Sequence, residues 1–88
     1  KETLGLLRIG NCHTRNGRDQ LAVEAYEEAV QRDPSFVKAW YNLSYLQAKI
    51  LGKTVAKMSA STDPSDPTLE PVRRLSKRVL DAYEAENR

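Results

Sequence analysis

The first part of this sequence places its packing residues at helical spacing. In residues 3–15 the side chains expected to face a neighbour recur at intervals of three and four, which puts them on one face of a helix. These positions are Leu6, Ile9, Gly10 and His13. Asn16 and Gly17 follow, and glycine tolerates the left-handed conformation in which helices commonly end. The pattern therefore predicts a helix over residues 3–15 and a tight turn after it.

A second helix is predicted from Asp19, whose carboxylate can cap free backbone N–H groups, to Asp33, which precedes a proline and so avoids helical angles. Its apolar stripe consists of Leu21, Ala22, Ala25, Tyr26, Ala29 and Val30, with Glu24, Glu27 and Glu28 on the other side. Because the connection to the first helix is short, the two helices are expected to form an antiparallel hairpin. Gly10 and Ala22 are small, which predicts a close approach of the helices there.

The third helix begins after Ser35, and its buried face is predicted to carry Trp40, Leu43, Leu46, Ile50 and Leu51. Its end is open to two interpretations. Gly52 could turn the chain and leave a short stub over residues 53–60. Alternatively, one long helix continues through Val55 and Met58, with Gly52 costing about 1 kcal/mol relative to alanine.

The last part of the chain is predicted to be a linker over residues 61–68 and a helix over residues 69–87. The linker is rich in Ser, Asp and Pro, which form turns. The apolar stripe of the helix is Val72, Leu75, Val79, Ala82 and Tyr83, and its solvated side carries Arg73, Arg74, Lys77 and Arg78. We expect this helix to cap the third helix by covering apolar surface that the third helix leaves open.

The spacing in the first hairpin resembles the tetratricopeptide repeat, a 34-residue helical hairpin. The positions that carry the resemblance are Leu6, Ile9, Gly10, His13, Ala22, Tyr26, Ala29 and Pro34. His13 and Leu6 depart from the aromatic residues usual at their positions, and a 34-residue step from Leu6 reaches the large residue Trp40. The resemblance covers residues 3–36 as one full repeat and residues 37–60 as an incomplete second one.

The resemblance implies an all-α fold, a right-handed stack of helices closed by the C-terminal helix. It also implies that the first helix of each hairpin lines a concave surface. The exposed positions of the two such helices include Leu4, Leu7 and Thr14, and we predict a peptide-binding site at Arg8, Asn11, Arg15, Lys38, Tyr41, Asn42, Tyr45 and Lys49. This set contains cations, amides and tyrosines but no acid. It therefore predicts a non-catalytic adaptor or scaffold that binds an extended, acidic peptide.

Composition limits the other classes of function. The chain has 88 residues and a net charge of +2, which allows one small domain and gives no indication of nucleic-acid binding. No apolar run approaches the roughly 18 residues of a membrane span. One cysteine excludes an internal disulfide and is compatible with the cytoplasm. The first residue is Lys1, which leads us to expect a piece of a longer protein. The alternative to peptide binding is self-association or a structural role within a larger complex.

Catalysis and metal binding have little support in the sequence. His13 is the single histidine, and as a neighbour of Cys12 on a helix it points about 100° away, so the two do not converge on a metal. No glycine-rich phosphate loop occurs. We therefore expect no enzyme activity, no metal and no cofactor.

Overall fold

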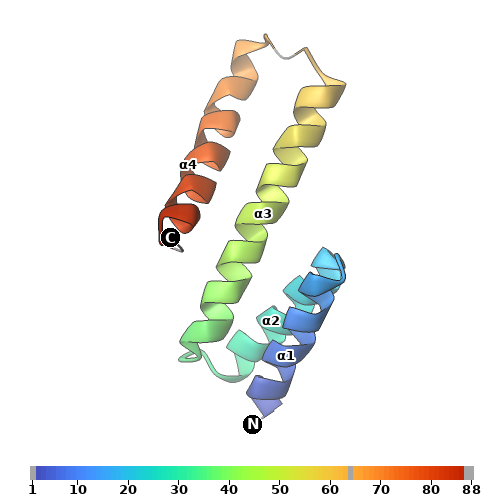
Figure 1. Cartoon of the computed structure of the whole chain (residues 1–88), viewed down its shortest axis with the longest axis vertical. Helices are drawn as coiled ribbons and strands as arrows, with labels where there is room; N and C mark the ends of the chain where they lie inside the picture. The colour runs from blue at the N-terminus through green and yellow to red at the C-terminus, as the bar shows by residue number, and fades with distance from the viewer. Residues whose placement is uncertain (1, 64, 87–88) are drawn as a thin grey trace. The chain divides into compact units, whose positions relative to one another are not determined.

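The computed structural model describes residues 2–63 and 65–86 and divides the chain into two compact units, Lys1–Gln47 and Ala48–Arg88. Its described residues form α1 (Glu2–Arg15), α2 (Asp19–Arg32), α3 (Val37–Ser61), the short 3-10 helix η1 (Pro67–Leu69) and α4 (Glu70–Glu86). No strand is present among these residues (Figure 1). The prediction of an all-α fold is confirmed, and residue 87, the predicted end of the last helix, lies outside the described residues.

The first unit is built on an antiparallel hairpin of α1 and α2, which lie side by side (Figure 1). The turn between them places Gly17 at a φ of 72°, which a residue with a side chain rarely adopts. The helices approach closely at Gly10, where a Cβ atom would lie 2.3 Å from Cε1 of the Tyr26 ring. The predicted close approach is therefore present, but the ring of Tyr26, rather than Ala22, covers Gly10.

The core of the first unit lies between this hairpin and the first part of α3. Its buried apolar residues are Leu7, Ala22, Val23, Ala25, Tyr26, Ala29, Val30, Ala39, Leu43 and Leu46. Leu7 was predicted to line the concave surface, and that prediction is wrong. The reason is that α1 turns Leu7 and Gly10 inward together, since positions three apart share a helix face.

Three residues predicted to be buried are largely exposed: Ile9 (49%), Leu21 (46%) and Trp40 (45%). Only one side of the α1–α2 hairpin is covered, by the first part of α3. Ile9 and Leu21 lie on the side that is not covered. Trp40 keeps a polar partner at the surface, because its indole Nε1 donates a hydrogen bond to the Pro34 carbonyl oxygen over 2.8 Å.

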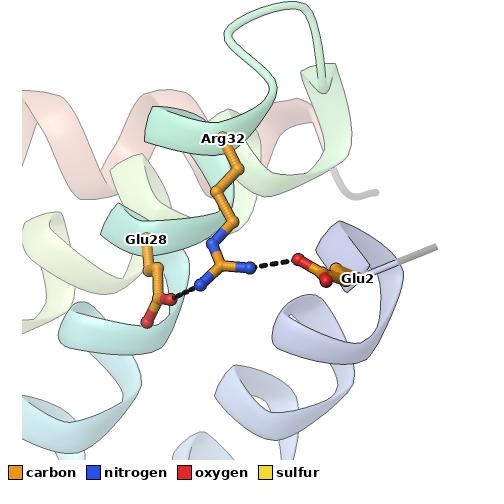
Figure 2. Close-up of polar contacts among 3 residues, drawn as sticks. All are labelled: Glu2, Glu28 and Arg32. Atoms are coloured by element: carbon orange, nitrogen blue, oxygen red, sulfur yellow. Dashed lines mark hydrogen bonds and ion pairs between the residues drawn. The ribbon is translucent and has the colours of Figure 1, made fainter.

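The open ends of the hairpin are joined by Arg32. Its guanidinium group binds the Glu28 carboxylate one turn earlier on α2, with 2.5 Å between Nη2 and Oε2, and also binds Glu2 on α1 (Figure 2). All three side chains are well exposed, so each ion pair contributes about 0–1 kcal/mol to stability. The two ion pairs therefore add little to the stability of the unit, and they show which sides of α1 and α2 adjoin.

The second unit contains the rest of α3 and all of α4. Helix α3 runs without interruption through Gly52, so of the two alternatives the structure has one long helix. Gly52 is a contact point, because a Cβ atom there would lie 3.0 Å from Cδ1 of Leu80 on α4. A second contact is the hydrogen bond that Arg73 Nε donates to Ser59 Oγ over 3.2 Å. Glycine thus serves close packing of α4 on α3 and does not break the helix.

The buried side of α4 differs from the predicted one. Ser76 is buried and Arg73 is half-buried, whereas Val72 and Leu75 are 39% and 55% exposed. The physical reason is the close contact at Gly52, which turns the side of α4 carrying Ser76 and Leu80 toward α3. The predicted packing of Val72 and Leu75 is therefore wrong, and the role of α4 as a cap stays a prediction.

Three aspartates organise the turns between helices by accepting hydrogen bonds from the residue two positions later. Asp33 accepts from the Ser35 hydroxyl (2.6 Å) and backbone N–H (3.1 Å), and Asp63 accepts from the same two groups of Ser65. Asp66 accepts from the Thr68 N–H over 2.9 Å. These bonds lower the pKa of each aspartate, mainly through the Ser35 hydroxyl at Asp33 and through the backbone N–H at Asp63 and Asp66.

The lowered pKa values predict a loss of stability in acid. A carboxyl group whose pKa is lower in the folded than in the unfolded chain stabilises the fold above the unfolded value of about 3.9, and this contribution is lost as the pH falls through the folded pKa. We expect the melting temperature to fall below about pH 4, and to fall less in the variant Asp33→Asn/Asp63→Asn/Asp66→Asn. Thermal melts by circular dichroism across the acid range test this. An equal loss in both proteins would contradict it.

Candidate peptide-binding face

The predicted site residues of the first unit, together with Leu4, form two stripes, one on each of two neighbouring helices. On α1 the stripe is Leu4, Arg8, Asn11 and Arg15, and on α3 it is Lys38, Tyr41, Asn42 and Tyr45. In both stripes successive residues lie mainly three and four positions apart, which keeps each stripe on one side of its helix. We call the surface formed by these two stripes the α1–α3 face.

A hydrogen bond joins the two stripes. Asn42 Nδ2 on α3 donates to Asn11 Oδ1 on α1 over 3.0 Å. The same oxygen accepts from the Tyr26 hydroxyl of α2 over 2.5 Å, so Asn11 connects all three helices. Asn11 and Asn42 are both half-buried. Because the hydrogen bond between them spans α1 and α3, the two stripes lie next to each other.

The Tyr26 hydroxyl was not predicted as part of this arrangement. It lies 3.3 Å from Thr14 Oγ1, and Thr14 also donates to the Gly10 carbonyl oxygen over 2.9 Å. A signal existed in the sequence, because a buried tyrosine needs a hydrogen-bond partner and Asn11 and Thr14 lie on the facing helix. Thr14, predicted to be exposed toward a ligand, is half-buried in this network.

The charge of the α1–α3 face is positive. Arg8, Arg15 and Lys38 are exposed, and within residues 2–63 and 65–86 none of the three has an ion-pair partner. No acid belongs to either stripe. Tyr41 adds an exposed aromatic surface beside these cations. The face therefore offers cations, an aromatic ring and amide groups, a combination suited to carboxylates and to peptide backbone.

Lys49, the last predicted site residue, belongs to the second unit. It is exposed on α3 one turn after Tyr45. Its part in peptide binding stays a prediction that follows from the helix register.

Cys12 and His13 do not form a reactive pair. Cys12 is exposed, and its Sγ accepts a hydrogen bond from Asn16 Nδ2 over 3.6 Å. His13 is half-buried, and its Nδ1 atom is buried with no partner in the part of the chain that the structure describes. Among the described residues no three His, Cys, Asp or Glu side chains group as metal ligands.

The arrangement of α1, α2 and the first part of α3 is that of a helical-repeat module. Residues 5–46 match the family model of the tetratricopeptide repeat, and this match ends beside the last residue of the first unit, Gln47. The first unit is therefore similar to a tetratricopeptide repeat, in agreement with the resemblance seen in the sequence. The incomplete second repeat over residues 37–60 stays a prediction. Searches of curated proteins and of solved structures gave no match.

Tetratricopeptide repeats generally mediate protein–protein interaction or assembly, and they are typically non-catalytic. Of the helices in the described residues, none is long and apolar enough to cross a membrane.

Proposed function

We propose that this protein is a non-catalytic binding module whose α1–α3 face takes an extended, acidic peptide. The observation that carries the proposal is the hydrogen bond between Asn42 and Asn11, because it brings the two predicted stripes side by side. The exposed cations of both stripes then act on one ligand. The similarity of residues 5–46 to the repeat family supports the general role of protein binding.

The role of each residue of the α1–α3 face follows from the chemistry of its side chain. Arg8, Arg15 and Lys38 attract acidic side chains and orient the peptide during encounter. Asn11 Oδ1 accepts two hydrogen bonds inside the unit, and these bonds orient the amide group. The Nδ2 group of Asn11 can then donate to a peptide carbonyl oxygen. Tyr41 and Tyr45 supply rigid apolar surface along α3.

Reversing two charges of the face should weaken peptide binding strongly without unfolding the unit. For the variant Arg15→Glu/Lys38→Glu we expect a loss of affinity for acidic peptides of about tenfold or more, which corresponds to about 1.4 kcal/mol. Both residues are exposed, so the melting temperature should change little. Titration of labelled acidic and basic extended peptides, followed by fluorescence anisotropy, measures the effect.

The matched control is Arg18→Glu/Lys57→Glu, which changes the net charge equally at two exposed positions outside the face. It should retain nearly all of the affinity. Binding of the wild-type protein should also weaken as salt is raised, because exposed charges are screened. Equal affinity for acidic and basic peptides, or an equal loss in both variants, would refute the proposal.

A further inference from the structure

One face of the α1–α2 hairpin is left open and is partly apolar. Glu2 and Ile9 lie seven residues apart on one side of α1, and Leu21, Glu28 and Arg32 share one side of α2. The ion pair between Glu2 and Arg32 shows that these two sides adjoin (Figure 2). Ile9 and Leu21 are both nearly half exposed on this surface, which we call the hairpin face.

A second open apolar stripe lies on α4. Its members are Val72, Leu75, Val79 and Ala82, at successive spacings of three, four and three residues. Val72 and Leu75 are exposed, because α4 packs on α3 through the side that carries Ser76 and Leu80. Single exposed leucines are common on protein surfaces, but a stripe with this spacing is typical of a helix that packs against another helix.

The two surfaces have opposite charge. Residues 20–31 of α2 contain three acids and no cation, and Arg32, which also lies on the hairpin face, is paired with Glu2 and Glu28. Residues 72–80 of α4 contain four cations and no acid, and two of these cations, Arg74 and Lys77, pair with Glu70 and Asp81 of the same helix. Glu24 follows Leu21 by three residues and Arg78 follows Leu75 by three, so each exposed leucine has a charged neighbour on its own helix surface. Neither Glu24 nor Arg78 has an ion-pair partner in residues 2–63 and 65–86.

We propose that α4 of one copy docks on the hairpin face of a second copy, so that the chain associates head to tail. Each copy supplies both surfaces, and the apolar stripe of α4 covers Ile9 and Leu21 while Arg78 meets the acids of α2, among them Glu24. Such a contact is heterologous, since two different surfaces meet. It is separate from the α1–α3 face and does not depend on peptide binding there.

Two single substitutions test this contact by complementation. Ile9→Glu blocks the hairpin face and Leu75→Glu blocks the stripe of α4, and both positions are exposed, so both variants should fold. In a dilution series followed by sedimentation velocity, the average mass of the wild-type protein should rise with concentration. Each variant alone should stay monomeric at least tenfold above the concentration at which the wild type associates. An equimolar mixture should give a 1:1 complex and nothing larger, because only one productive contact remains.

Further variants make the outcome unambiguous. Val37→Glu introduces the same charge at an apolar residue that is 75% exposed elsewhere, and it should associate like the wild type. Leu21→Glu and Val72→Glu replace the two test variants if either fails to fold. The variant Arg15→Glu/Lys38→Glu, which changes the α1–α3 face, should also associate like the wild type. This result would separate the contact between copies from the proposed function.

Four results would overturn the proposal. A wild-type protein that stays monomeric throughout the series excludes the contact. Self-association of Ile9→Glu alone would indicate pairing of two α4 stripes, and self-association of Leu75→Glu alone would indicate pairing of two hairpin faces. Absence of a 1:1 complex in the mixture of folded variants would show that the two surfaces do not bind each other.

Discussion

Replacing Gly10 by alanine should destabilise the first unit by about 1–3 kcal/mol, although alanine is the better helix former. The added Cβ atom would lie 2.3 to 2.9 Å from three atoms of the Tyr26 ring. That ring cannot move away easily, because Tyr26 is only 2% exposed and its hydroxyl is bonded to Asn11. Trp40 is the single tryptophan and lies in the first unit, so its fluorescence in a urea titration reports the unfolding of that unit.

Gly5→Ala is the matched control for this experiment. Gly5 lies on the same helix, and a Cβ atom there would meet nothing within 4 Å. The control should therefore stabilise the unit by up to about 1 kcal/mol through helix propensity. If both substitutions shifted the midpoint in the same direction, the close packing of Tyr26 on Gly10 would be disproved.

The largest loss is expected for Tyr26→Ala, at about 3–5 kcal/mol. The substitution removes a buried ring between the helices and leaves the hydrogen-bonding oxygen of Asn11 with Asn42 as its remaining donor. Small domains have total stabilities of about 5–15 kcal/mol, so this loss would remove a large part of the stability of the first unit.

Tyr26→Phe separates the ring from the hydroxyl. It keeps the apolar packing and should cost about 0.5–1.5 kcal/mol, the usual worth of one hydrogen bond. Tyr41→Ala, which removes a tyrosine that is 42% exposed, should cost about 1 kcal/mol at most. Urea titrations of the three variants should give this order. A Tyr41→Ala variant less stable than Tyr26→Ala would show that the assignment of core and surface is wrong.

The helices and their boundaries could be predicted largely from the sequence, because they depend on local chemistry. Gly17 marks the turn of the first hairpin and occupies a positive φ there, and Asp33 with the following proline ends α2. The spacing of small and large residues, such as Gly10 and Tyr26, was sufficient to indicate the repeat that residues 5–46 match. These features need only the period of the helix and the conformational limits of glycine and proline.

Which faces are covered was decided by the tertiary structure. Periodicity places Leu7, Ile9 and Gly10 on α1 but does not tell how far the helix is rotated, and the contact of Gly10 with Tyr26 turns Leu7 inward and leaves Ile9 exposed. On α4 the contact at Gly52 likewise buries Ser76 and exposes Leu75.

The candidate site shows the same division. The sequence determined which residues carry the charges and amides of the α1–α3 face. The hydrogen bonds that Asn11 receives from Tyr26 and Asn42 exist only once three helices meet, since these residues lie 15 and 31 positions from Asn11 along the chain. A helical pattern thus defines which side chains share a face, whereas close contacts between helices decide which faces are buried, because a glycine admits a neighbour that any larger residue would keep away.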